Sequence, residues 1–221
     1  MCFSAGASFA GGAVVTAIGI ATVKRMRKPE QRLFSAIPLL FGLQQISEGF
    51  VWVALQNPGN QVMLNISGYL FLLAAVVIWP TMVPLAVLKM EHNPSRRRYL
   101  KIFLGAGIII SLYYGTGLII HNVEPQISHH HIKYVNDFPR SLVIPVFILY
   151  LLATLIPLYI SSIKNIYLFG ILATISLFLT GIFFREYLTS VWCFFAAFIS
   201  ITVYWIISAE DRRLPVTPLL N

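Results

Sequence analysis

The stretch from Arg96 to His121 reads RRRYLKIFLGAGIIISLYYGTGLIIH. Three arginines stand at its start, and no charged residue follows Lys101 before the histidine. The apolar run has about the 20 residues that a helix needs to cross the hydrocarbon layer of a membrane. Basic residues beside such a run are retained on the cytoplasmic side. The stretch therefore predicts a transmembrane helix that runs outward from the cytoplasm.

Six further apolar stretches of similar length fill most of the 221 residues. Hydrophobic residues make up 57% of the chain and charged residues only 11%, whereas soluble domains carry about 25% charged residues. A single buried core cannot account for this excess, so we expect lipid to cover it. The sequence predicts an all-α polytopic membrane protein, a single domain over 1–221 built as a seven-transmembrane helix bundle. We expect its spans at 3–23, 33–55, 63–88, 100–120, 140–161, 166–184 and 188–207.

The distribution of lysine and arginine predicts how these spans are threaded. Only Lys133, Arg140 and Arg185 fall in one set of alternate connectors, and every other basic residue falls in the opposite set. The basic connectors should face the cytoplasm, which places the N-terminus outside and the C-terminus inside. In the first span the basic residues follow the apolar run instead of preceding it, so we interpret 1–23 as a retained helix and not as a signal peptide.

The formal net charge of +8 does not indicate nucleic-acid binding. The basic residues are juxtamembrane, and no basic segment interleaved with aromatic residues accompanies them. Such charges suit anionic lipid headgroups at the cytoplasmic face. We therefore expect membrane lipids as partners and no nucleic acid.

Glu48 is the acid that the sequence places well inside a span. It lies seven residues, roughly 10 Å, below the outer end of the span at 33–55. An ionisable group at such a depth is costly and marks a candidate functional site. Gln44 and Trp52 lie four residues on either side of it on the same helix face, and Gln45 is close by.

Other polar residues are predicted at the same outer side of the membrane. His121 ends the fourth span, and Tyr114 lies seven residues before it on the same helix face. The outer ends of further spans and the long connector at 122–137 supply the remaining candidates: Cys2, Ser4, His129, His130, His131, Ser190 and Cys193.

Thiol, imidazole and carboxylate groups are the ligands of zinc and other transition metals. The sequence therefore suggests an outward-facing metal site drawn from Cys2, Glu48, His121, His129, His130 and His131. No HExxH, no CxxC and no pair of histidines four residues apart supports it by spacing.

Each candidate ligand also has a purely structural interpretation. Glu48 can be protonated or paired inside the bundle, His121 can be an interfacial residue, and the histidine run can belong to a solvated loop. Cys193 can be a small packing residue, or it can form a disulfide with Cys2 at an oxidising face.

Several strings resemble an uncharacterised family of bacterial membrane proteins that begin MCFSA. They are Met1-Cys2-Phe3-Ser4-Ala5, Gln44-Gln45 with Glu48-Gly49 and Trp52, Trp79-Pro80, His129-His130-x-Ile132-x-Tyr134, and Ser190-Val191-Trp192-Cys193-Phe194-Phe195. The resemblance spans essentially the whole chain and implies a seven-helix protein, which we expect in the cell inner (plasma) membrane. It implies no reaction, but it suggests that Cys2, Glu48, His129 or His130 and Cys193 share one site. Tyr134 is a further candidate pocket residue.

Better-known classes of membrane protein do not fit the residues. The span at 188–207 has no lysine for a retinal Schiff base, and it has no histidine pair of the kind that holds zinc in membrane hydrolases resembling alkaline ceramidases. The chain also has no GxxxxGK[ST] phosphate-binding loop.

Three hypotheses for the function remain. The first is a zinc-dependent hydrolase of a lipid or amphiphile, with Glu48 as metal ligand or general base. The second is a proton- or cation-coupled transporter, or a sensor, without chemistry of its own. The third is a structural membrane scaffold in which the polar residues only set the register of the helices.

Overall fold

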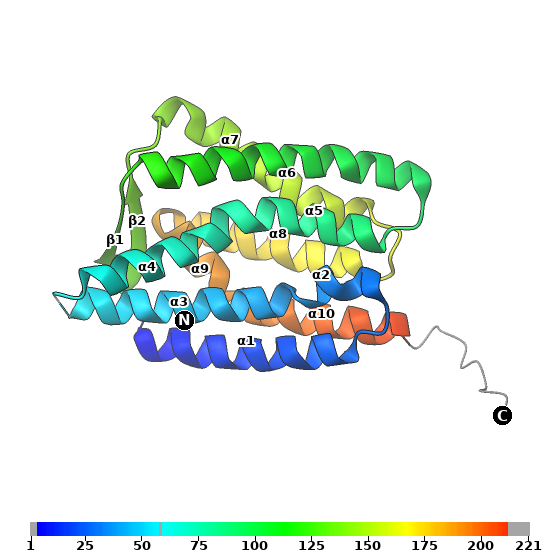
Figure 1. Cartoon of the computed structure of the whole chain (residues 1–221), viewed down its shortest axis with the longest axis horizontal. Coiled ribbons are helices and arrows are strands. Elements are labelled where there is room, and N and C mark those ends of the chain that lie inside the picture. Colours follow the sequence, from blue (N-terminus) through cyan, green and yellow to red (C-terminus); the bar gives the residue numbers. More distant parts are fainter. Residues whose placement is uncertain (1–3, 58, 212–221) are drawn as a thin grey trace.

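Long helices, arranged roughly side by side, make up most of the computed structural model, which describes residues 4–57 and 59–211 (Figure 1). In chain order the helical elements are α1 (Ala5–Arg25), the 3-10 turn η1 (Pro29–Gln31), α2 (Arg32–Ser35), α3 (Ile37–Gln56), α4 (Gln61–Leu72), the π-helix η2 (Leu73–Ile78), α5 (Trp79–Met90), α6 (Pro94–Ile120), α7 (Arg140–Ile160), α8 (Ile166–Phe183), the 3-10 turn η3 (Arg185–Tyr187), α9 (Leu188–Phe194) and α10 (Ala196–Asp211).

Within the described ranges, six helical stretches are long and apolar enough to cross a membrane. They are Ala5–Arg25, Pro29–Gln56, Gln61–Met90, Pro94–Ile120, Arg140–Ile160 and Ile166–Phe183. Each overlaps one of the first six predicted spans. The protein is thus mostly helical, with six candidate membrane-spanning helices.

The segment predicted as one span at 188–207 is not a single continuous helix. It is divided into α9 and α10 at Phe195, whose N–H donates to the Trp192 carbonyl three residues back. This tighter turn interrupts the α-helical bonding pattern. The apolar helical segment after the break, Ile199–Glu210, is shorter than the six candidate spans.

The connector predicted as a loop at 122–137 folds into a β-hairpin. Strands β1 (Val123–Ser128) and β2 (His131–Asn136) pair antiparallel, with Val123 opposite Asn136 and Ser128 opposite His131. His129 and His130 form the turn at φ 46° and 63°. Hairpin turns with positive φ usually contain Asn-Gly or Asp-Gly. The His129-His130 sequence therefore did not predict this turn.

The hairpin lies across one end of the bundle (Figure 1). The fully buried Ile132 packs with Val51 and Trp52 of α3. Tyr134 stacks on Phe71 of α4, with ring centroids 5.0 Å apart. Because alternate side chains of a strand point to opposite faces, these even-numbered residues anchor β2 to α3 and α4.

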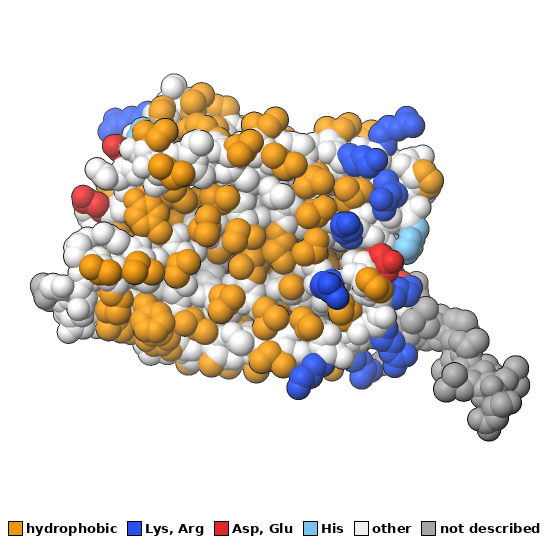
Figure 2. Space-filling view, in the orientation of Figure 1, with side chains coloured by type: hydrophobic (Ala, Val, Ile, Leu, Met, Phe, Trp, Pro, Cys, Tyr) orange, Lys and Arg blue, Asp and Glu red, His pale blue; other side chains and the backbone are white. Residues whose placement is uncertain are grey.

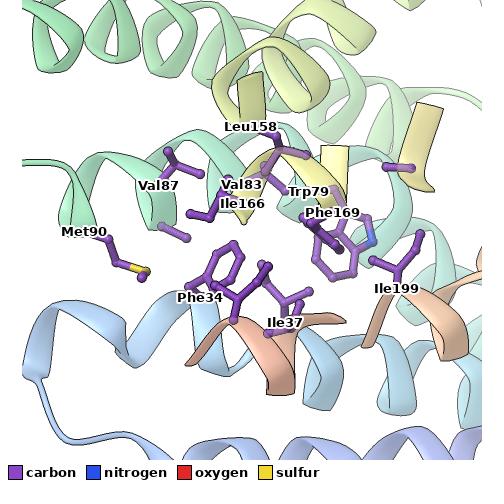
Figure 3. Close-up of a cluster of buried hydrophobic side chains, with 14 of the residues drawn as sticks. Phe34, Ile37, Trp79, Val83, Val87, Met90, Leu158, Ile166, Phe169 and Ile199 are labelled. Atoms are coloured by element: carbon purple, nitrogen blue, oxygen red, sulfur yellow. The ribbon is translucent and has the colours of Figure 1, made fainter. Parts of the chain in front are cut away.

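A continuous apolar core occupies the middle of the bundle (Figure 3). Phe34 of α2 meets Phe169 of α8 edge to face at 5.9 Å. Phe41 of α3 packs on Trp79 of α5 at 4.1 Å. The core thereby joins the N-terminal and C-terminal halves of the chain, because residues from α2, α5, α7, α8 and α10 all contribute to it.

Charge and apolar surface are separated along the long axis of the molecule. Figure 2 shows most lysine and arginine side chains gathered at the end opposite the hairpin, with apolar side chains covering the middle. Ile109 and Leu112 of α6 and Phe178 of α8 are among the exposed apolar side chains. Such a belt is what lipid solvation requires of the sides of a membrane bundle.

Candidate functional site

The polar residues predicted on α3 are all buried. Glu48 is fully buried, and Gln44, Gln45 and Trp52 are at most 5% exposed. The Gln44 side-chain oxygen accepts a hydrogen bond from Trp79 Nε1 at 3.0 Å, and its amide nitrogen lies 3.5 Å from the Phe71 carbonyl. Gln44 therefore links α3 to both α4 and α5.

The predicted histidines separate into two groups at opposite ends of the hairpin. His121 Nδ1 lies 3.2 Å from Asp137 Oδ1 at the base of the hairpin, and its ring contacts Phe138. At the turn, His129 Nδ1 lies 3.1 Å from Ser128 Oγ. Strands of six residues span roughly 20 Å at about 3.3 Å per residue. His121 is therefore far from the histidine run.

The three histidines of the run have different surroundings. His129 Nδ1 also lies 3.3 Å from the Tyr187 hydroxyl, and His130 is exposed. His131 is 6% exposed and stacks on the Tyr187 ring at 4.7 Å. Burial lowers the pKa of His131, and positive charge at its histidine neighbours lowers it further. The buried ring is thus disposed to be neutral.

The described part of the chain does not assemble the predicted metal site. Within it, no three His, Cys, Asp or Glu side chains come close enough to hold a metal ion. The length of the hairpin explains why His121 cannot join His129–His131. Cys2 lies outside the described residues, and α9 contains Cys193, whose side chain also lies outside them. A zinc site that includes either cysteine stays a prediction.

The other predicted pocket residues lie in several places. Ser4 caps α1, because its hydroxyl accepts a hydrogen bond from the Ala7 N–H at 3.3 Å. Ser190 is fully buried in α9. Tyr134 belongs to β2, and its ring stacks on Phe71 as described above. Tyr114 lines a cavity in the bundle that the sequence did not predict.

The π-helix η2 lies beside that cavity. The Trp79 N–H donates to the Ala74 carbonyl five residues back, so the next bond in the series would join residue 80 to Ala75. Residue 80 is a proline and has no N–H to donate. The Tyr150 hydroxyl of α7 donates to the Ala75 carbonyl instead, at 2.8 Å. A side chain on another helix thus supplies the donor that Pro80 lacks, and π-helical turns often lie at functional sites.

The cavity beside this turn has a volume of about 150 Å³, and we call it the inner cavity. Its walls come from α3, η2, α5, α6, α7, α8, α9 and α10. None of the described side chains that line it is charged. Seven of the lining residues are aromatic: Phe41, Trp79, Tyr114, Phe147, Tyr150, Phe169 and Trp192.

A second cavity, of about 170 Å³, lies between the first and the hairpin, and we call it the outer cavity. Val123, Tyr134 and Asn136 of the hairpin line it, together with residues of α6 and α7. Three residues line both cavities: Val76, Tyr114 and Thr189. The two cavities therefore adjoin and lead from the hairpin end toward the centre of the bundle.

The composition of these walls limits what the site can do. The described residues that line the two cavities include no carboxylate, imidazole, thiol or amine, so they offer neither a nucleophile with its base nor a set of metal ligands. Glu48 lines neither cavity. Apolar walls with a few fixed polar groups are instead typical of small-molecule binding sites.

Sequence reasoning had identified Gln44 and Tyr114 by depth and helix face, but it missed Tyr150, Phe169 and Ala173. The available signal was the Trp79-Pro80 pair, since a proline inside a span must have its freed carbonyl satisfied by a neighbour. The sequence does not say which neighbour supplies that donor.

A family model described as "Family of unknown function (DUF6629)" matches residues 1–217, so the chain belongs to that family. No curated protein and no solved structure matches the chain.

Proposed function

We propose that this member of the DUF6629 family is a seven-span protein of the plasma membrane that binds a neutral, largely apolar small molecule in its inner cavity. It would act as a receptor or carrier without chemistry of its own. The observation that carries the proposal is a cavity inside a membrane-type helix bundle whose described lining residues are uncharged and include seven aromatic side chains.

Helix lengths and charge support seven spans. Together α9 and α10 cover Leu188–Asp211, a rise of about 36 Å if helical throughout, and the hydrocarbon layer is about 30 Å thick. The pair is therefore long enough to serve as the seventh span. The basic end of the bundle would face the cytoplasm and its anionic headgroups. The hairpin and the N-terminus would then lie outside.

The dimensions and walls of the inner cavity indicate the kind of ligand. A dry protein cavity of about 150 Å³ accommodates a molecule such as benzene, so this one suits a single ring or a short segment of chain. Aromatic side chains pack well against rings, edge to face or offset. The absence of charge among the described lining residues disfavours an ionic ligand, whose desolvation would have no compensation there.

Quenching of tryptophan fluorescence by bromobenzene, a neutral ring with a heavy atom, tests the proposal. Trp79 and Trp192 line the inner cavity. A Trp52→Phe, Trp205→Phe background leaves these two as the only tryptophans of the chain. We expect saturable quenching in protein reconstituted into lipid nanodiscs, because the probe should fill a limited number of sites.

Two matched variants locate the binding. Ala173 lines the cavity, and Ala173→Leu should fill part of it and weaken the saturable quenching at least tenfold. Ala10 is exposed on α1, and Ala10→Leu makes the same change without altering the quenching. Quenching that never saturates, or that is equal in the two variants, would reflect partition into lipid and refute the proposal.

A further inference from the structure

We infer that Tyr114 is the specificity-determining residue of this site and that the ligand carries a neutral acceptor oxygen, such as a carbonyl or ether, on its ring. The inference rests on the proposed function and narrows the class of ligand. It begins from the position of Tyr114, which lines both cavities where they adjoin.

The other polar groups around the inner cavity already have partners within the protein. Trp79 Nε1 donates to Gln44, and the Tyr150 hydroxyl donates to the Ala75 carbonyl. Trp192 Nε1 donates to Ser176 Oγ at 2.8 Å, and the Thr154 hydroxyl donates to the Tyr150 carbonyl at 2.9 Å. These donors hold the walls in place and are not available to a ligand.

Tyr114 differs from them. Its ring is held edge to face with Tyr113 at 5.4 Å and tilted against Phe138 at 6.0 Å. In the described part of the structure its hydroxyl forms no hydrogen bond with another residue. The ring is thus positioned by packing, while the hydroxyl keeps its capacity to donate.

The depth of Tyr114 in the bundle makes its hydroxyl donor important for binding. Tyr114 lies seven residues before His121, which places it roughly 10 Å from the outer end of α6. Tyr114 is half-buried, and water that could compete for its hydroxyl is scarce at such a depth in a bilayer. A ligand oxygen that accepts from Tyr114 would gain a hydrogen bond, whereas a pure hydrocarbon of the same shape would not.

The arrangement of the cavities orients such a ligand. The ring would occupy the inner cavity among Trp79, Tyr150 and Phe169, and the oxygen would lie at the junction beside Tyr114. Any further substituent would extend into the outer cavity toward Asn136. The class assigned is therefore a neutral, ring-bearing ketone, ether or similar amphiphile.

Two probes of matched shape test the inference. They are 4-bromoacetophenone and 4-bromo-α-methylstyrene, in which a methylene group replaces the carbonyl oxygen. Binding is measured by quenching of Trp79 and Trp192 in the Trp52→Phe, Trp205→Phe background, with each affinity corrected for the partition of the probe into lipid. We expect the ketone to bind about tenfold more tightly than the hydrocarbon, as one hydrogen bond would give.

Tyr114→Phe should remove this preference and leave hydrocarbon binding unchanged, which also shows that the cavity is intact. Tyr204→Phe deletes the same oxygen from an exposed residue of α10 that lines neither cavity, and it should keep the preference. Equal binding of both probes to the parent protein, or a ketone preference that survives Tyr114→Phe, overturns the inference while the proposed function stands. Saturable binding of neither probe overturns both.

Discussion

Gly107 shows how one residue positions the site. It lies on α6 where that helix crosses α5, and a Cβ atom at this position would collide with the carbonyl oxygen of Pro80. Tyr114 lies seven residues further along α6 and so shares its helix face with Gly107. The missing side chain lets α6 approach closely enough to bring Tyr114 to the wall of the cavity.

Gly107→Ala should therefore destabilise the protein even though alanine is the better helix former. The new methyl group must push apart two packed backbones, which costs about 1–3 kcal/mol. Gly105→Ala on the same helix is the control, because a Cβ there meets nothing within 4 Å. It should leave stability unchanged or raise it by up to about 1 kcal/mol. Thermal denaturation in detergent micelles distinguishes them, and equal midpoints would contradict the close approach.

At the scale of elements, a buried acid joins two helix connections at the basic end of the bundle. Glu91 follows the end of α5 and is fully buried. Its carboxylate accepts hydrogen bonds from the N–H of Ser162 at 2.6 Å, the hydroxyls of Ser161 and Ser162, and the N–H of Asn93 at 2.8 Å. Arg97 donates to the Glu91 carbonyl at 2.7 Å. The α5–α6 connection is thereby tied to the α7–α8 connection.

This arrangement predicts a dependence of stability on pH. Burial by itself would raise the pKa of Glu91, but the hydrogen bonds from Ser162, Asn93 and Ser161 outweigh it and hold the pKa below its ordinary value of 4.5. A carboxyl whose pKa is lower in the folded state stabilises the fold above the unfolded-state pKa, and that contribution is lost as pH falls through the folded-state pKa. The stabilisation from Glu91 should therefore be complete above about pH 4.5.

Glu91→Gln should lower the free energy of unfolding at pH 7 by about 1–3 kcal/mol, because charge-assisted hydrogen bonds are lost. The difference from the parent protein should shrink as the pH falls below 4.5. Glu30→Gln, an exposed acid in η1, serves as the control and should change little. Denaturation midpoints between pH 3 and pH 8 measure both, and a gap independent of pH would show that the charge of Glu91 is not what stabilises the fold.

At the scale of the whole molecule, the separation of charge along the bundle predicts its orientation. Exposed Arg98 lies at the basic end near the start of α6, and exposed His130 lies in the hairpin turn at the other end. If the bundle crosses the membrane with its basic end inside, these residues lie on opposite sides.

A membrane-impermeant maleimide tests this orientation. In a Cys2→Ser, Cys193→Ser background, His130→Cys should react in right-side-out vesicles, and Arg98→Cys only in inverted ones. Permeabilised vesicles provide the control, since both cysteines should then react. Labelling of both from the same side would rule out the proposed threading and the outward-facing position of the outer cavity.

Part of this architecture follows from local sequence alone. Each of the first six spans was predictable because a helix in lipid must satisfy its own backbone hydrogen bonds and present apolar side chains along its whole length. Helix caps are local as well. At α6 the Asn93 Oδ1 accepts hydrogen bonds from the N–H groups of Ser95 and Arg96 in the first turn. The position of Gln44 and Glu48 on one helix face was predictable from their spacing of four residues.

Other features depended on which elements meet in space. The sequence has no Asn-Gly pair that would predict the hairpin. Ile132 and Tyr134 hold the hairpin in place by packing on α3 and α4. The length of that hairpin separates His121 from His129. Residues that were expected close together in a loop therefore lie at opposite ends of the hairpin. The inner cavity needs Gln44, Tyr150 and Trp192 side by side, and hydropathy does not encode which helices are neighbours. Spans are set by each segment's transfer into lipid, a local free energy, whereas the binding site arises from packing between segments far apart in the chain.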